Sequence, residues 1–379
     1  MRRLTAITAA CLSLVGLLLG VAILLPGQGL VDPGLEYGYV CSSEKSESID
    51  FTLAAARPES YFLFGSSELV TRPEVVVSAP SNVFRDYDCG MQFMFIGDSY
   101  DQSLWMAIAA GAYAQDMPNN KIAIIVSLQW FFDGGLEPGL FNMRFSYNLY
   151  RAFCENENIS RETKDYVAGR LAAEGIDRAI LDAADPKLPQ DYLNALAFSA
   201  MSDMRLRQSL IELRQYGSER VEPSLGEPDF ALLRQQAIAS AQRMSTNNEW
   251  GILDDYWAYY LEPLFEARKG ELSGETLSRT PEFEDFLCFL EICEQAGLEP
   301  YVVFMPVNGY WYDHAGLSAD TRAALYERLG EICEQREVTY LDLSVHEYEL
   351  YYMRDIMHLG WLGWLEVEEG FMAFVREEL

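Results

Sequence analysis

Short apolar runs alternate with longer amphipathic stretches over most of the chain. The runs are rich in β-branched and aromatic residues and end in polar or glycine-containing turns, which is typical of buried strands. The stretches between them show helical spacing, as in Glu282–Ala296, where Phe283, Phe286 and Leu290 share one face. The runs cover residues 61–64, 93–96, 121–126, 301–305 and 338–343. This alternation predicts an α/β domain with a parallel sheet of about five strands flanked by helices.

The stretch from about residue 145 to residue 274 shows helical spacing without a strand pattern. Ser160 precedes one amphipathic stretch in the position of a helix cap, and Gly175 and Gly217 follow two such stretches as stops. We therefore predict a helical insertion between the third and the fourth strand. Because the alternating pattern resumes after it, we expect residues 58–379 to form one domain.

Residues 1–30 differ in character from the rest of the chain. Arg2 and Arg3 precede residues 4–25, an uncharged run of 22 residues that is long enough to cross a bilayer as a helix. The two arginines favour a cytoplasmic amino terminus, and the absence of an Ala-x-Ala-like site after the run argues against a cleaved signal peptide. The sequence thus predicts a cytoplasmic stub with a single-pass membrane anchor in residues 1–30. A connector follows in 31–57, and residues 58–379 form the extracytoplasmic domain.

The charge balance excludes one class of partner. The chain has 58 acidic and 28 basic side chains and a formal net charge of −30, whereas nucleic-acid binding needs a concentrated basic surface. The cysteines follow no metal-ligand spacing and the three histidines are scattered, so we expect no metal and no cofactor. Cys41 and Cys89 can form a disulfide in an oxidising exterior, but the sequence leaves their pairing open.

Candidate chemistry lies at the end of the first predicted strand. The run 61–64 stops at Gly65, and Ser66 and Ser67 follow it. A serine on a sharp strand-to-helix turn is a common position for a hydrolase nucleophile, and catalytic groups of open α/β sheets lie at the carboxyl ends of strands. The same serines can also simply cap the next helix. A nucleophilic role therefore requires a base and an oxyanion hole from elsewhere in the chain.

Asp355 and His358 follow the last predicted strand and can supply that base. A carboxylate three residues before an imidazole can hold one ring nitrogen and leave the other free, although a structural histidine is the alternative. For the oxyanion hole, Gly97 can offer its backbone N–H, Gln129 its side-chain amide and Ser67 its own N–H. Together, the strand ends predict Ser67, His358 and Asp355 as a catalytic triad.

The order of these residues resembles the SGNH (GDSL-like) hydrolases, whose blocks supply Ser, Gly, Asn and Asp-x-x-His in that order. The chain resembles the DltD family more closely still, through the segments FGSSEL at 64–69, SLQWF at 127–131 and HLGWLGW at 358–364. The likeness extends over the apolar amino terminus and most of residues 61–364. Two positions depart from the superfamily pattern, because Gln129 stands where asparagine is usual and Ser66 where aspartate is usual.

The resemblance implies a flavodoxin-like sheet and a membrane-anchored acyltransferase that moves D-alanyl groups onto lipoteichoic acid of Gram-positive cells through a Ser67 acyl-enzyme. It also implies partnership with a membrane-bound acyltransferase of the same pathway and with a D-alanyl carrier protein. Within the site, Ser66, Gln102, Trp130 and Trp361 are candidates for substrate contacts. Ordinary core packing is the alternative for the two tryptophans.

Several alternatives stay open at this level. Gly97-Asp98-Ser99 is closer to the literal Gly-Asp-Ser block, so Ser99 competes with Ser67, as does the adjacent Ser66. We prefer Ser67 for two reasons. If Ser99 were the nucleophile, no earlier family block would correspond to the turn at residues 66–67. Gly97 would then belong to the nucleophile block and could not serve as the glycine of the oxyanion hole. The same residues suit an O-acetyltransferase or esterase acting on another surface polysaccharide. A non-catalytic scaffold of the D-alanylation complex is a further alternative.

Overall fold

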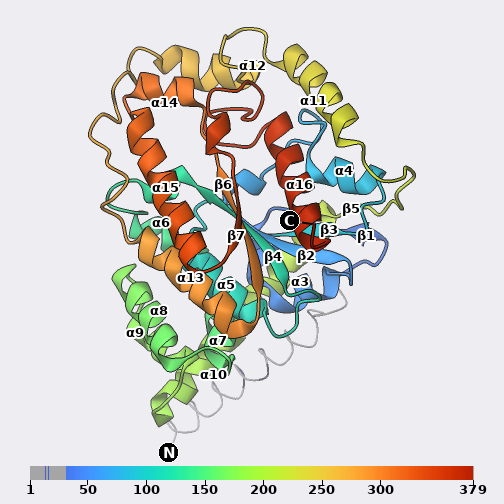
Figure 1. The fold of residues 1–379 in the computed structure, drawn as a ribbon. Helices are drawn as coiled ribbons and strands as arrows, with labels where there is room; N and C mark the ends of the chain where they lie inside the picture. The colour runs from blue at the N-terminus through green and yellow to red at the C-terminus, as the bar shows by residue number, and fades with distance from the viewer. Residues whose placement is uncertain (1–12, 14–15, 17–30, 379) are drawn as a thin grey trace, which may run out of the picture.

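The computed structural model describes residues 31–378, together with the isolated positions 13 and 16 (Figure 1). The predicted stub and anchor in residues 1–30 lie outside these residues, apart from the same two positions. Among the helices that the structure describes, none combines the length and the apolar character that a membrane span requires.

A five-stranded parallel sheet forms the centre of the domain, as the alternating pattern predicts. Its strand order is β3-β2-β4-β6-β7, so the chain crosses over between strands instead of forming hairpins. The strand of this sheet that comes first along the chain, β2, therefore lies inside the sheet, between β3 and β4. The strands are β2 (Ser60–Phe64), β3 (Gln92–Ile96), β4 (Lys121–Ser127), β6 (Glu299–Met305) and β7 (Thr339–Asp342).

Helices cover both faces of this sheet, which explains why its strands read as almost continuous apolar runs. Successive strand residues alternate between two cores. Phe62 and Phe64 pack into the core on one face, whereas Leu63 packs into the core on the other. Figure 1 shows α5, α13 and α15 on one side of the sheet, and α4, α11 and α16 on the other. The six helices are α5 (Ser103–Tyr113), α13 (Glu282–Ala296), α15 (Ala319–Gln335), α4 (Pro80–Asp86), α11 (Phe230–Met244) and α16 (Trp361–Val375).

The chain between β4 and β6 is mostly helical. Its one described strand is β5 (Ser218–Glu219), which pairs antiparallel with β1 (Leu35–Glu36) outside the central sheet. Within it, α11 packs on the sheet face beside α16, whereas α7, α9 and α10 pack against one another. Besides α11 and α13, the α-helices of this stretch are α6 (Pro138–Arg144), α7 (Tyr147–Glu155), α8 (Arg161–Ala173), α9 (Arg178–Ala184), α10 (Pro189–Leu213) and α12 (Asp254–Tyr256). Another helix, α14 (Gly309–Ala315), follows β6.

The predicted connector is a packed part of the domain. It contains α2 (Ser43–Glu47) and α3 (Ile49–Ala55). Lys45 of α2 is fully buried, and its ammonium group donates to the carbonyl oxygens of Tyr37 (3.0 Å) and Gly38 (2.9 Å). Cys41 and Cys89 both carry free thiols, so the disulfide left open by the sequence is not formed in this structure.

Candidate active site

The carboxyl ends of the parallel strands bring distant segments of the chain together. Ser67 begins a 3-10 helix, Ser67–Leu69, immediately after β2 and the turn at Gly65 and Ser66. His358 lies in the loop that follows β7, 291 positions further along the chain. The two side chains meet, because His358 Nε2 is 3.1 Å from Ser67 Oγ. This contact is long-range and depends on the strand order.

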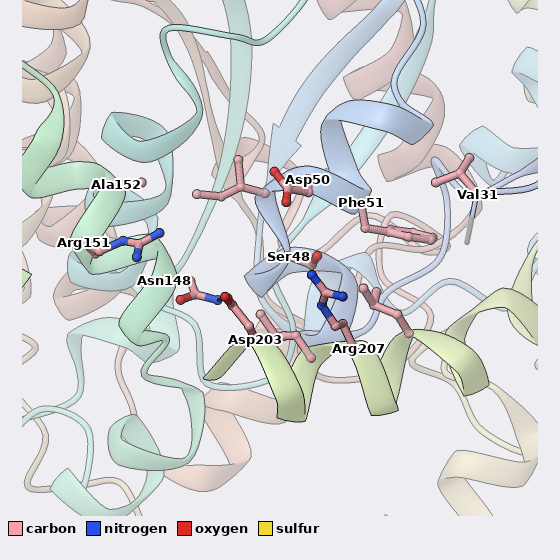
Figure 2. Close-up of a pocket in the computed structure, with 12 residues that line it drawn as sticks. Val31, Ser48, Asp50, Phe51, Asn148, Arg151, Ala152, Asp203 and Arg207 are labelled. Atoms are coloured by element: carbon pink, nitrogen blue, oxygen red, sulfur yellow. Dashed lines mark hydrogen bonds between the residues drawn. The ribbon is translucent and has the colours of Figure 1, made fainter. Parts of the chain in front are cut away.

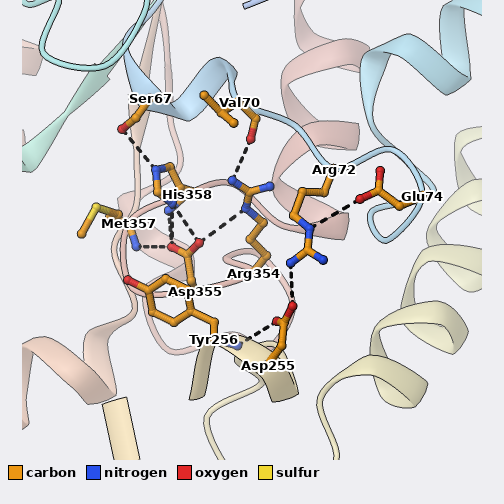
Figure 3. A network of polar contacts seen from close by, with 10 residues as sticks. All are labelled: Ser67, Val70, Arg72, Glu74, Asp255, Tyr256, Arg354, Asp355, Met357 and His358. Atoms are coloured by element: carbon orange, nitrogen blue, oxygen red, sulfur yellow. Dashed lines mark hydrogen bonds and ion pairs between the residues drawn. The ribbon is translucent and has the colours of Figure 1, made fainter. Parts of the chain in front are cut away.

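A carboxylate holds the other side of the histidine ring. His358 Nδ1 is 2.8 Å from Asp355 Oδ2 and 3.0 Å from Asp355 Oδ1 (Figure 3). Because an ionised carboxylate only accepts hydrogen bonds, the proton of a neutral ring belongs on Nδ1. Nε2 is then free to accept the hydroxyl proton of Ser67. This geometry is the arrangement that a serine nucleophile needs.

The Asp355 carboxylate is buried but well supported. Its Oδ1 accepts the backbone N–H groups of Met357 and His358, both at 2.9 Å. Burial alone would raise the pKa of Asp355, but His358, the nearby Arg354 and the Met357 N–H outweigh it and lower the pKa below 3.8. The carboxyl group is therefore ionised at neutral pH, the state in which it orients the imidazole and stabilises its protonated form.

The loop that carries Asp355 and His358 is a tight hairpin. Met353 and Leu359 form an antiparallel bridge, and the Arg354 N–H donates to the His358 carbonyl oxygen at 3.0 Å. Gly360 closes the hairpin, where a Cβ atom would lie only 2.7 Å from the carbonyl oxygen of Tyr351. Glycine is needed here because the backbone approaches so closely.

Arg354 links this hairpin to the nucleophile turn. Its guanidinium is buried, with Nη2 donating to the Val70 carbonyl oxygen at 2.7 Å and Nε lying 3.4 Å from Asp355 Oδ2. Figure 3 shows the arginine between these two groups, with Tyr256 beside Asp355. Val70 in turn donates its N–H to the Ser67 carbonyl oxygen at 3.0 Å. Arg354 therefore connects the serine turn to the Asp355 carboxylate.

Glu68 follows Ser67 directly and is a second buried carboxyl group. It is 3% exposed, and its Oε1 makes no hydrogen bond within the described part of the chain. Burial, partly offset by backbone N–H groups and His358, raises the pKa of Glu68 from 4.5 to about 7. A glutamate with a raised pKa next to a candidate nucleophile is a group that the apolar pattern of the sequence does not reveal.

The Glu68 pKa predicts a specific pH dependence of stability. Between pH 4.5 and about 7 the unfolded chain ionises Glu68 while the folded chain keeps it protonated, so stability falls as pH rises through this window. The Glu68 contribution is on the order of 3 kcal/mol. In Glu68→Gln, the change in unfolding free energy across this window, measured by urea denaturation, should shrink by that amount. An unchanged pH dependence in the variant would contradict the assignment.

The backbone N–H of Gly97, which the sequence suggested for the oxyanion hole, already has a hydrogen-bond partner. Its N–H donates to Ser46 Oγ at 2.9 Å, so an oxyanion role requires this hydrogen bond to open. The glycine is explained by geometry, because its φ is +124° and a Cβ atom would lie 1.9 Å from the Gly65 carbonyl oxygen. Its close approach lets the turns after β2 and β3 pack together.

Gln129 lies at the predicted edge of the sheet. It belongs to the 3-10 helix Leu128–Phe131, which follows β4, and β4 pairs with β2. Its side-chain Nε2 donates to the buried hydroxyl oxygen of Tyr312 at 2.7 Å. An amide NH2 group has two hydrogens, so one remains for a second acceptor. Tyr312 thereby orients the amide without exhausting it.

The four residues predicted to contact substrate take no part in the hydrogen bonds that join Ser67, His358 and Asp355. Ser66 is buried and its Oγ donates to the Asp98 carbonyl oxygen at 3.3 Å. Gln102 lines a separate cavity of about 30 Å³. Trp130 is buried in the core, and Trp361 is completely buried with its indole N–H donated to the Val75 carbonyl oxygen at 3.1 Å. The two tryptophans are therefore packed as core residues, which was the alternative to substrate contact, and their described surroundings give a substrate no access to them.

Sequence reasoning did not assign Arg354, Glu68 or Ser46 to the site. Arg354 and Glu68 are each adjacent in sequence to a predicted catalytic residue, and this adjacency could have indicated that they belong to the site. For Ser46 the sequence carries no signal, because a helix in the connector brings it to Gly97, 51 positions away.

Comparison with known proteins gives a consistent result. A family model described as DltD protein matches residues 41–376. The chain is similar to Protein DltD of Bacillus subtilis (strain 168), with 28% identity over 327 residues that cover 83% of this chain and 82% of the relative. It is also similar to Protein DltD of Staphylococcus aureus (strain NCTC 8325 / PS 47), with 26% identity over 325 residues, covering 84% and 81%. Because the family model matches most of its length, the chain belongs to the DltD family.

Proposed function

We propose that this chain is an extracytoplasmic acyltransferase, anchored in the membrane by residues 1–30, that transfers D-alanyl groups onto lipoteichoic acid. The observation that carries the chemistry is the continuous hydrogen-bonded chain from Ser67 Oγ through His358 to Asp355. Membership of the DltD family supports the pathway, and the uncharged run at residues 4–25 supports the anchor.

In the proposed first step, His358 Nε2 takes the hydroxyl proton of Ser67 while Ser67 Oγ attacks the carbonyl carbon of a D-alanyl ester or thioester. The new bond joins Oγ to the carbonyl carbon. When the tetrahedral intermediate collapses, the bond to the leaving oxygen or sulfur breaks, and that atom takes the proton from His358. The product is a D-alanyl ester on Ser67.

In the second step a hydroxyl group of lipoteichoic acid replaces the leaving group. It gives its proton to His358 Nε2 and attacks the acyl-enzyme, and Ser67 Oγ recovers a proton as its ester bond breaks. Asp355 keeps the imidazole oriented in both steps. The backbone N–H of Ser67 and the remaining amide hydrogen of Gln129 are the proposed oxyanion donors.

The proposal assigns the partners as well. A membrane-bound acyltransferase of the pathway would bring the D-alanyl group to the outer face of the bilayer, and a D-alanyl carrier protein would supply it. Water competes with the polymer for an acyl-enzyme, so the acceptor hydroxyl must be positioned in the site before the ester forms.

The test measures D-alanine esters on lipoteichoic acid in cells that lack the native gene and carry either the unchanged chain or Ser67→Ala. We expect Ser67→Ala to reduce the ester content to that of cells without the gene, while Ser99→Ala restores it. A scaffold would restore the esters in spite of Ser67→Ala. An O-acetyltransferase would leave them unchanged in every strain and alter the O-acetyl content of another polymer instead.

A further inference from the structure

The amino-terminal half of α10 carries almost no charge. Residues 188–202 contain a single charged side chain, Asp191, in a chain in which 23% of residues are charged. Asp191 is 5% exposed and its carboxylate caps the start of the helix, accepting the N–H of Leu188 at 2.8 Å. The surface of this half-helix is therefore free of charge, although the chain as a whole has a net charge of −30.

Large apolar side chains project from this half of the helix into solvent. Leu193 is 68% exposed and Leu196 is 71% exposed. The spacing of four exposed residues places them on one side of the helix, whereas Met201, which is also exposed, lies further round. We call these four the α10 stripe; it consists of Leu188, Tyr192, Leu193 and Leu196. A contiguous exposed apolar surface of this kind marks an interaction site.

The carboxyl-terminal half of the same helix is covered. Leu210 and Leu213 are buried together with Tyr37 and Phe51, and Val31 packs against this cluster. Figure 2 shows Asp203 and Arg207 of α10 facing Asn148 and Arg151 of α7 across a cavity of about 280 Å³, with Val31 near its far side. The amino-terminal half is also packed on its inner side, where Arg151 donates to Ser199 Oγ at 2.7 Å and Phe198 packs beside Tyr147. The side chains of the stripe lie on its exposed side.

The position of Val31 indicates what lies against the stripe. Val31 lies six residues after Leu25, the last residue of the uncharged run 4–25. With that run in the bilayer, Val31 and the carboxyl-terminal half of α10, against which it packs, lie close to the bilayer surface. The stripe, about 20 Å further along the same helix, reaches that surface when α10 lies parallel to it. Exposed leucines with a tyrosine among them match the residues that sit in a membrane interface.

We propose that the α10 stripe rests on the outer surface of the lipid bilayer, with Leu193 and Leu196 in the headgroup–acyl boundary. This proposal depends on the membrane anchor of the proposed function and is independent of its chemistry. The stripe gives the domain a second membrane contact beside the anchor and so restricts its orientation.

The orientation has a consequence for the active site. Figure 1 places α9 and α10 at one end of the domain and α12 and α14 at the other. The latter two border the triad, since Tyr256 of α12 lies beside Asp355 and the Asn308 cap of α14 donates its N–H to the Ile356 carbonyl oxygen at 3.4 Å. With the α10 stripe on the bilayer, α12, α14 and the triad beside them lie toward the opposite end of the domain.

Photo-crosslinking in the full chain tests the contact. Benzoylphenylalanine is introduced as Leu196→benzoylphenylalanine or, as a matched control, Val345→benzoylphenylalanine, because both side chains are 71% exposed. Val345 lies just after β7, at the carboxyl edge of the sheet. The proteins are reconstituted in vesicles of phosphatidylglycerol and phosphatidylcholine, irradiated and analysed by mass spectrometry. We expect lipid adducts at position 196 and several-fold fewer at 345.

Other outcomes overturn the proposal. Equal lipid adducts at both positions, or none at 196, mean that the stripe does not contact the bilayer. A protein–protein adduct at 196 assigns the stripe to a second copy of the chain, and a chain that does not float with the vesicles removes the anchor on which the proposal rests. Fluorophosphonate labelling of the same samples reports the Ser67 chemistry separately, so failure of the membrane contact and failure of the catalytic proposal are distinguishable.

Discussion

Replacing Ser67 by alanine is expected to abolish covalent labelling of the protein by a serine-reactive fluorophosphonate. Ser67 Oγ is the hydroxyl oxygen that lies 3.1 Å from His358 Nε2, so it alone loses its proton readily to the triad. The side chain is partly exposed, and the reagent can reach it. Removal of one oxygen atom leaves the 3-10 helix backbone unchanged, so the loss should be complete without unfolding. In-gel fluorescence with a fluorophosphonate probe measures it.

Two serines near the same sheet edge serve as controls. Ser66 donates its hydroxyl proton to the Asp98 carbonyl oxygen, and Ser99 is part of a turn in which its N–H donates to Asp98 Oδ1 at 2.6 Å. We expect Ser66→Ala and Ser99→Ala to keep most of the labelling. Full labelling of Ser67→Ala, with loss in either control, would move the nucleophile to the other serine.

Asp355→Asn is expected to slow fluorophosphonate labelling by about 10³- to 10⁴-fold. An asparagine amide donates a hydrogen bond toward His358 Nδ1, so the ring proton moves to Nε2. The ring can then no longer accept the Ser67 proton. The variant also removes the charge that stabilises the imidazolium ion in the transition state. The labelling rate as a function of probe concentration measures the effect.

Asp133→Asn is the matched control for this variant. Asp133 is also a hydrogen-bonded carboxylate with an arginine partner, since Arg279 Nη2 lies 2.7 Å from its Oδ2, but it stands outside the triad. Both substitutions remove an ion pair, and both should lower the thermal midpoint of unfolding. Only Asp355→Asn should slow labelling at a temperature where both variants are folded; equal slowing in the two would reduce Asp355 to a structural role.

The apolar pattern was sufficient for the sheet because of how parallel strands are buried. Strands covered on both faces have little room for polar residues, so β2, β3, β4, β6 and β7 all stand out as apolar runs with boundaries close to those observed. The family could also be recognised from the sequence, because its motifs are short contiguous segments. The two-residue strands β1 and β5 were missed because a pair so short leaves no periodic signal.

The contacts within the site could not be predicted from the sequence pattern. Which serine meets His358 depends on the turn geometry after β2, where a rotation of one residue exchanges a buried hydroxyl for an accessible one. The Gly97 N–H was assigned to the oxyanion hole, but the distant Ser46 accepts its hydrogen bond. Arg354 joins Val70 across 284 positions of sequence. Each of these contacts is set by packing between elements that are remote along the chain.

The sequence by itself determined the α/β architecture, the membership of the DltD family and the positions of Ser67, Asp355 and His358 at strand ends. Buried strands and short motifs are contiguous along the chain, so both can be recognised in the sequence. Only the tertiary structure decided which hydroxyl faces the imidazole and which donors are already occupied. It also decided that Trp361 is a core residue and that one side of the amino-terminal half of α10 is exposed. These properties depend on distances between side chains, and such distances exist only after the crossover connections have placed the strand ends side by side.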